Sequence, residues 1–451
     1  MKRRNVVALV GILMFSNGLK AVAAGHARDQ PAQVQVEDAG SSGPPDFYAP
    51  EEALRGYINE ALDRSPAARE RLARYGAALA RVPQVSTLPD PVFSFSQAIR
   101  SVETRVGPQL NTYMLSQAFP WFGKLKLHGK VATQEALSLF ELYRATQQEI
   151  VVQVKRAFYD FAYVDAAIAI TREEQSLLEH YEELAQTRYA TGQGLQHAVI
   201  KIQAEITRVL NRLDILAQQR TSLEARLNTL MDRPPQSALP PAGVLRLPEV
   251  DLDLEQLYRL GDQNRQELKA AEKRIERSER TIDLAKTSYW PNFFLGVAFV
   301  NVGGRSDPAG IELPPPDNGK NAVSISAGIN IPIWRDKYDA AMREASETLL
   351  AERSSYANVR NEMDFSIRDQ VVRIETLEEQ LRLFEDVLIL QAEETLRATE
   401  AAYGTGQLGV LDLLDSERVL LNVRIVNARY HSDLLNALAN LERAIGTRFP
   451  R

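Results

Sequence analysis

The sequence predicts a mainly α-helical protein with a small β part, built as an internal duplication. Four short segments alternate between apolar and small polar residues, which is the period of two that strands show. Two very long stretches, residues 124–188 and 335–402, carry a helical pattern without a proline. The turn motif Tyr-x-Thr-Gly-Gln begins at Tyr189 and again at Tyr403, 214 residues later. Such self-similarity favours two copies of one structural unit.

The four alternating segments are each predicted to be a strand with one apolar and one small polar face. They lie at residues 92–99, 111–119, 293–300 and 323–334, and the last is the clearest. The residues predicted to share the apolar face are Phe93, Phe95, Ile99, Tyr113, Leu115, Phe119, Phe293, Leu295, Val297, Phe299, Val323, Ile325, Ala327, Ile329, Ile331 and Ile333.

These strands favour a membrane barrel over a half-buried soluble sheet. Their length suits an outer-membrane crossing when tilted, and small polar residues on the second face suit a water-filled lumen. Four strands cannot close a barrel, and an open edge in lipid leaves costly unpaired backbone groups. Three copies would supply about twelve strands. The aromatic residues that would form an interfacial belt are Phe119, Trp121, Phe122, Trp290 and Trp334.

The first residues resemble a secretory signal peptide over residues 1–23. Basic residues at 2–4 precede an apolar run at 6–15 and small residues at 21–24. Because no later run is long enough for a membrane helix, a periplasmic or a barrel protein is expected. Removal of 1–23 changes the formal charge from -6 to -10, since four basic residues are lost. An acidic chain is a poor ligand for nucleic acid. Residues 24–49 are expected to be a flexible segment.

The composition points to no cofactor, no metal and no enzyme. Cysteine is absent, so no disulfide or thiolate metal site is expected. Gly192-x-Gly194 lacks the strand and further glycine of a nucleotide loop. The neighbouring acids Glu173 and Glu174 are expected to be a solvated helix face, not an acid–base pair. The histidines without metal-ligand spacing are His26, His128, His180, His197 and His431.

The first repeat is predicted at residues 50–233. Its expected elements are a helix at 51–81, the first two strands, a loop at 100–109, a long helix at 124–188 and a return helix at 195–231. Pro83 and the prolines after it are expected to end the first helix. At 1.5 Å per residue the long helix would measure roughly 100 Å.

A proline-rich linker at 234–251 leads to the second repeat at 252–446 and a tail at 447–451. The expected elements are a helix at 252–286, two strands separated by an exposed loop at 303–321, a long helix at 335–402 and a return helix at 408–445. Helix lengths suggest that the return helix of each repeat stacks end to end on the first helix of the other repeat.

Two motifs resemble the TolC family of outer-membrane efflux proteins. One is Phe119-Pro120-Trp121-Phe122-Gly123-Lys124 at a strand exit, and the other is Tyr403-x-x-Gly406 followed by Val-Leu-Asp-Leu-Leu-Asp at 410–415. The resemblance covers nearly all of residues 50–446. It implies a homotrimer with one twelve-stranded outer-membrane barrel and a helical tunnel through the periplasm. A passive duct for small molecules or metal ions, with no enzyme activity, is expected from this family.

The resemblance also implies partners: outer-membrane lipid, a periplasmic adaptor (membrane fusion) protein and an inner-membrane efflux pump. The strand exit is most similar to the branch that serves heavy-metal exporters. A type I secretion duct and a soluble periplasmic coiled-coil scaffold or adaptor are the alternative interpretations.

The resemblance assigns a gate to the second-repeat turn. Asp412 and Asp415 match aspartates at the periplasmic mouth of the family's tunnel, where six carboxylates in a trimer would attract cations. Stabilisation of a helix N-terminus by acidic residues is the other interpretation of both. Tyr403 matches a tyrosine that helps to hold the mouth closed. Its polar partners are replaced here by Leu408 and Ala198, so closure of this gate is expected to rest on packing or on other residues.

Overall fold

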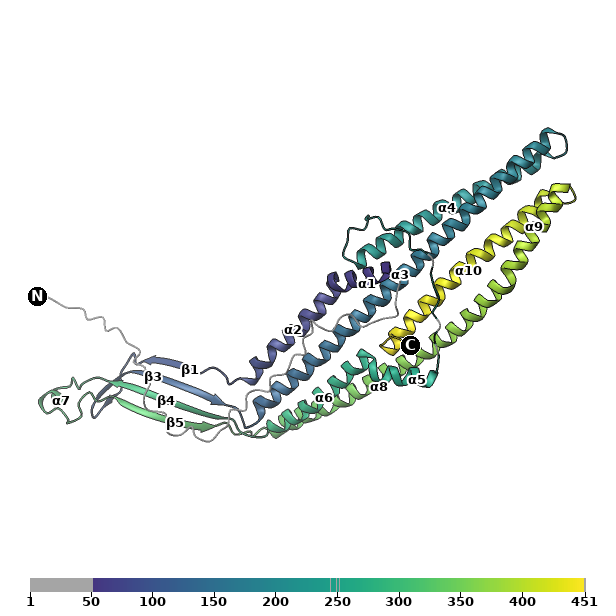
Figure 1. The fold of residues 1–451 in the computed structure, drawn as a ribbon. Helices are drawn as coiled ribbons and strands as arrows, with labels where there is room; N and C mark the ends of the chain where they lie inside the picture. The colour runs from purple at the N-terminus through teal and green to yellow at the C-terminus, as the bar shows by residue number, and fades with distance from the viewer. Residues whose placement is uncertain (1–51, 244, 249, 251, 450–451) are drawn as a thin grey trace, which may run out of the picture. The chain divides into compact units, whose positions relative to one another are not determined.

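A computed structural model describes residues 52–243, 245–248, 250 and 252–449 (Figure 1). It confirms a mainly α-helical fold with one antiparallel sheet. The signal peptide and flexible segment predicted at 1–23 and 24–49 lie outside the described residues. The helices are α1 (Glu52–Arg64), α2 (Pro66–Ser86), α3 (Lys124–Ala190), α4 (Gln196–Leu230), α5 (Leu254–Asn264), α6 (Gln266–Thr287), α7 (Pro308–Glu312), α8 (Arg335–Leu383), α9 (Ile389–Thr405) and α10 (Val410–Ile445).

The helices differ from the prediction at four points. The helix predicted at 252–286 is two helices, α5 and α6, because the extended backbone of Arg265 separates them. The first predicted helix is two, because the Ser65 hydroxyl accepts a hydrogen bond from Ala68 N at 3.4 Å and so caps a new helix, α2. Pro83 does not end α2, which continues to Ser86. A π-helical turn, η1 (Phe384–Leu388), separates α8 from α9 within the predicted helix 335–402. By contrast, α3 is one continuous helix of 67 residues, as predicted.

The sheet has the strand order β1-β3-β4-β5, with every neighbouring pair antiparallel. Its strands are β1 (Val92–Gln97), β2 (Glu103–Thr104), β3 (Gly107–Phe119), β4 (Phe293–Val302) and β5 (Ala322–Ile329), of which β2 pairs only with the start of β3.

Several strand boundaries differ from the prediction. The first strand, predicted at 92–99, ends at Gln97, and the third, predicted to end at 300, continues to Val302. The strand expected to reach residue 334 ends at Ile329, because Pro332 has no N–H with which to continue a ladder. The loop expected at 100–109 is shorter, since β3 already begins at Gly107. Gly107 has a φ of 122°, and a Cβ there would lie 1.8 Å from the carbonyl oxygen of Gly303. Only glycine therefore fits where this turn meets the 303–321 loop, which contains α7.

The register places on one face of the sheet those predicted apolar residues that lie within the strands, whereas Ile99, Ile331 and Ile333 lie outside the strands. Two rows cross all four strands, and each residue in them is exposed. They are Phe93, Leu115, Val297 and Ile325, and Phe95, Tyr113, Phe299 and Val323. The adjacent row on the opposite face consists of Ser94, Met114, Ala298 and Ser324. The sheet thus presents a continuous apolar surface that nothing in the described part of the chain covers.

The sheet also has two open edges. Within the described residues, β1 pairs only with β3, and β5 pairs only with β4. Each edge strand therefore presents backbone N–H and C=O groups on its outer side without a ladder partner. Among the helices of the described residues, none has the apolar length that a bilayer crossing demands.

The helices form two hairpins. In one, α3 packs along α4 and α2, and in the other, α8 and α9 pack along α10, while α3 also contacts α6 and α10 (Figure 1). The sheet lies at the start of α3 and α8, and the two hairpin turns lie at the far ends of the long helices.

The predicted end-to-end stacking of the helices is wrong. The end of α4 meets α1 of its own half, where Arg233 Nε donates to Glu60 Oε1 at 2.7 Å. The end of α10 likewise meets α6, where Arg443 Nη1 donates to Glu267 Oε2 at 3.2 Å. Length could not discriminate between the two pairings, because α2 and α6 have 21 and 22 residues. These ion pairs select the pairing within each half.

A buried ion pair joins the two hairpins. Lys155 of α3 lies 2.5 Å from Glu442 of α10, and each side chain is 3% exposed. Desolvation of both charges costs free energy that their attraction must offset. The pair therefore fixes which faces of α3 and α10 meet more than it adds to stability.

Lys155→Met should destabilise the protein, because it leaves the Glu442 carboxylate buried without the Lys155 ammonium. We expect the free energy of unfolding to fall by about 3–5 kcal/mol. Urea denaturation of the detergent-solubilised protein, followed by circular dichroism, measures the change. The double variant Lys155→Met, Glu442→Leu removes both charges and should recover most of the loss. A single variant as stable as the parent would contradict this account.

Candidate functional site

The two hairpin turns have the same backbone geometry. Gly192 and Gly406 take φ values of 75° and 78°, the left-handed conformation that glycine adopts at a helix end. The amide of Gln193 donates to the Arg188 carbonyl at 2.9 Å, and that of Gln407 donates to the Ala402 carbonyl at 2.9 Å. The repeated motif thus ends both long helices in one way.

Arg188 connects the two turns. Its Nη1 donates to the carbonyl oxygen of Tyr403 at 2.6 Å, and its Nη2 donates to that of Gly404 at 2.9 Å. The guanidinium also lies over the Tyr403 ring, 5.0 Å from the ring centroid. Tyr403 is 6% exposed, whereas its counterpart Tyr189 is 50% exposed. One motif therefore gives an anchored tyrosine in one turn and a free surface tyrosine in the other.

Asp412 and Asp415 lie on the first turns of α10 and are both exposed. Asp412 Oδ2 accepts a hydrogen bond from Gly409 N at 3.2 Å, so this residue also caps its helix. Neither aspartate forms an ion pair within the described residues. The predicted capping role is thus present at Asp412, and its carboxylate remains accessible to solvent.

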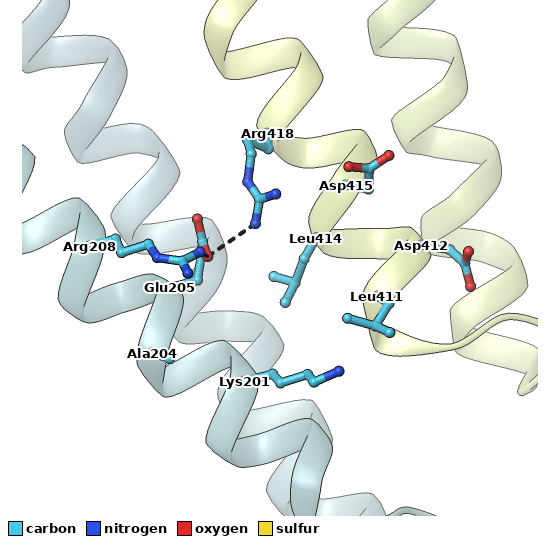
Figure 2. Close-up of a pocket in the computed structure, with 9 residues that line it drawn as sticks. All are labelled: Lys201, Ala204, Glu205, Arg208, Leu411, Asp412, Leu414, Asp415 and Arg418. Atoms are coloured by element: carbon cyan, nitrogen blue, oxygen red, sulfur yellow. Dashed lines mark hydrogen bonds and ion pairs between the residues drawn. The ribbon is translucent and has the colours of Figure 1, made fainter.

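Both aspartates line an open groove of 530 Å³ between α4 and α10. Figure 2 shows their carboxylates turned away from Arg208, while Leu414 points into the groove. Across the groove, Glu205 of α4 accepts from Arg208 Nη1 at 2.6 Å and from Arg418 Nη2 of α10 at 3.2 Å. The Glu205 carboxylate is therefore paired with two guanidinium groups, whereas no arginine or lysine of the described residues pairs with the Asp412 or Asp415 carboxylate.

Farther along the same helices, acidic and phenolic groups are buried between the hairpins. Glu174 of α3 and Glu417 of α10 are 6% and 3% exposed, which contradicts the expected solvated position of Glu174. Burial raises the pKa of both carboxyl groups, and the charge of Glu174 raises the pKa of Glu417 further. Tyr181 of α3 donates to the Glu400 carboxylate of α9, and burial raises its pKa as well.

The structure brings together only part of the predicted gate. Tyr403 is buried at the second turn, and Asp412 and Asp415 lie beyond that turn, at the beginning of α10. Leu408 is exposed, whereas Ala198 packs against the neighbouring apolar cluster. Sequence reasoning missed Arg188, Glu205 and Glu417. One signal was available, because Glu174, Tyr181 and Arg188 recur every seven residues and so share one face of α3.

Known proteins resemble this chain along most of its length. A family model described as outer membrane efflux protein matches residues 57–233 and 257–447. Outer membrane protein TolC of Vibrio cholerae is 23% identical over 334 residues, which are 70% of this chain and 72% of that protein.

Two solved structures share the fold. The outer membrane protein VceC from Vibrio cholerae superposes with a TM-score of 0.72 at 19% identity, covering 88% of this chain and 97% of VceC. CusC, whose structures describe folding and transmembrane channel formation, gives a TM-score of 0.70 at 18% identity, covering 89% of this chain and 93% of CusC. Because the family model matches far more than half of its residues, the chain belongs to the outer membrane efflux protein family.

Proposed function

We propose that three copies of this chain form a passive duct for efflux across the outer membrane. The observation that carries the proposal is the sheet, which combines two open edges with a continuous exposed apolar face. Three sheets joined edge to edge would make a barrel of about twelve strands, with the apolar rows toward lipid and the small polar rows toward the lumen. A soluble scaffold would leave those apolar rows in water.

The two halves of the chain are proposed to be an internal duplication. The same family model matches both halves, at residues 57–233 and 257–447, and both hairpin turns have the same hydrogen bonds. The proposed repeats are 50–233 and 252–446, joined by the 234–251 linker and followed by the 447–451 tail. With two similar halves per chain, a trimer would place six similar strand pairs and six helical arms around one axis.

The helices are proposed to extend the duct into the periplasm, with the hairpin turns at the end nearer the inner membrane. There a periplasmic adaptor would bind and connect the duct to an inner-membrane efflux pump, which supplies the energy.

Aromatic side chains at the other end of the helices are consistent with a membrane boundary there. Trp121 stacks on Trp290 with ring centroids 4.9 Å apart, while Phe122 and Trp334 are exposed where strands meet helices. The proposed cargo is small molecules or metal ions, with no chemical reaction.

The turns are proposed to be the gate. Arg188 and Tyr403 hold the two turns of one chain together, in place of the polar set that Leu408 and Ala198 cannot supply. Asp412 and Asp415 of three copies would place six exposed carboxylates near the axis, where they would favour cations.

Arg188→Ala should open the gate more often, because it removes two charge-assisted hydrogen bonds between the turns. At a partly exposed site they are worth about 1–2 kcal/mol together. That corresponds to about a tenfold rise in the ratio of open to closed channels in planar bilayers. Arg188→Lys keeps the positive charge but cannot donate two parallel hydrogen bonds, so its ratio of open to closed channels should lie between those of the parent and of Arg188→Ala. Arg172→Ala, an exposed arginine of the same helix, is the control. An unchanged open fraction in Arg188→Ala would remove Arg188 from the gate.

The double variant Asp412→Asn, Asp415→Asn should abolish cation preference. Asparagine retains a capping oxygen for the Gly409 amide, so the fold should persist while the charge is lost. The reversal potential across a salt gradient in a planar bilayer should move toward zero. Glu394 is an exposed acid on α9, and Glu394→Gln, as the control, should leave the reversal potential unchanged. Channels that keep their preference in the double variant would refute the aspartate assignment, and a parent protein without channels would refute the duct.

A further inference from the structure

A carboxyl pair is buried between the two helical hairpins. Glu174 belongs to α3 and Glu417 belongs to α10, and the pair lies beside the apolar cluster that includes Leu178, Leu413 and Leu420. Both residues are more than nine-tenths buried. Two acids in such a position repel each other unless something supplies positive charge between them.

The contacts of the pair are those that a shared proton would satisfy. The Oε2 atoms of Glu174 and Glu417 are both buried and find no hydrogen-bond donor within the described residues. The two carboxyl groups nevertheless face each other within hydrogen-bond reach. Ionised carboxylates only accept, so a bond between them requires a proton on one. No group of three or more His, Cys, Asp or Glu in the described residues is arranged to hold a metal ion.

The surrounding charged groups do not neutralise the pair. From α4, Arg212 attracts the charge of Glu174 while Glu205 repels that of both acids. Arg418 of α10 also attracts both, but it donates to Glu205 at 3.2 Å. Tyr181 of α3 donates its proton to Glu400 of α9 and offers none to the pair.

These surroundings set the pH at which the pair ionises. Burial raises the pKa of both carboxyl groups, to about 7 for Glu174 and to about 8 for Glu417. Because the two groups interact, these two values describe the titration of the pair. A carboxyl group whose pKa is raised in the packed state stabilises that state fully below its ordinary pKa of 4.5. This contribution is lost as the pH rises through 7 to 8.

We propose that Glu174 and Glu417 form a protonation-dependent clasp that holds the two hairpins together while it shares a proton and releases them when both groups are ionised. The clasp rests on the proposed gate, since Glu417 follows Asp415 by two residues on α10. Separation at the clasp would carry Asp412 and Asp415 away from α4. The duct would then open more readily on the alkaline side of neutrality.

The distance between the hairpin turns tests the clasp without reference to conduction. Gln193 and Gln407 are exposed, one on each turn, and the chain has no cysteine of its own. Spin labels on Gln193→Cys and Gln407→Cys, in full-length protein diluted with unlabelled copies, report the distance by pulsed electron resonance. Between about pH 6 and pH 9 the parent should show a rise in that distance with a midpoint near pH 8, where the pair loses its last proton.

Glu417→Gln should remove the pH dependence and keep the short distance, because the glutamine amide donates permanently to Glu174. Glu174→Gln makes the same test from the other side and replaces the first variant if that one does not fold. Glu173→Gln changes the exposed neighbour and should behave like the parent. A distance that does not change with pH in the parent, or a shift that persists in both glutamine variants, would overturn the clasp. Channels that conduct without such a shift would reject the clasp and leave the duct standing.

Discussion

The sheet imposes the constraint on which the rest of the structure depends. Its outer strands β1 and β5 each lack a second neighbour in the described part of the chain, and one face carries two rows of exposed apolar side chains. Backbone groups at a lipid-facing edge cost several kcal/mol each when unpaired. An edge of this kind is tolerable only when another strand covers it. The proposed assembly of copies would supply that strand and so satisfy the edges of the sheet.

Polar side chains of α3 fix the alignment of the two helical hairpins, because three of them contact α9 or α10 of the second hairpin. Lys155 pairs with Glu442, Tyr181 with Glu400, and Arg188 with the backbone at Tyr403. The buried pair of Lys155 and Glu442 must be satisfied in one arrangement, so it specifies how the hairpins align more than it stabilises their contact. Glu174 lies in the same series, and its contact is satisfied only while a proton is present. The contact between the hairpins therefore depends on pH at Glu174.

Local patterns predicted the strands, the faces and the matching turns, because alternation and glycine at a helix end are local properties. Tertiary context decided the rest. Two glutamates adjacent in sequence, Glu173 and Glu174, lie one in solvent and one in the interior, and nothing in either residue alone distinguishes them. The π-helical turn at Phe384–Leu388 and the continuation of α2 past Pro83 also have no clear local signal. Tyr403, Asp412 and Asp415 were predicted through family resemblance, whereas the contact of Tyr403 with Arg188 joins residues 215 positions apart and follows only from the fold.

The number of chains in the detergent-extracted protein tests the central claim most directly. Native mass spectrometry of the protein, released from its detergent micelle in the gas phase, counts the copies that share one barrel. If the edges of β1 and β5 close on one another, a single species of three chains will dominate at all protein concentrations above the detection limit. A monomer that remains folded without detergent, or an open series of two, three, four and more chains, would contradict closure of the sheet.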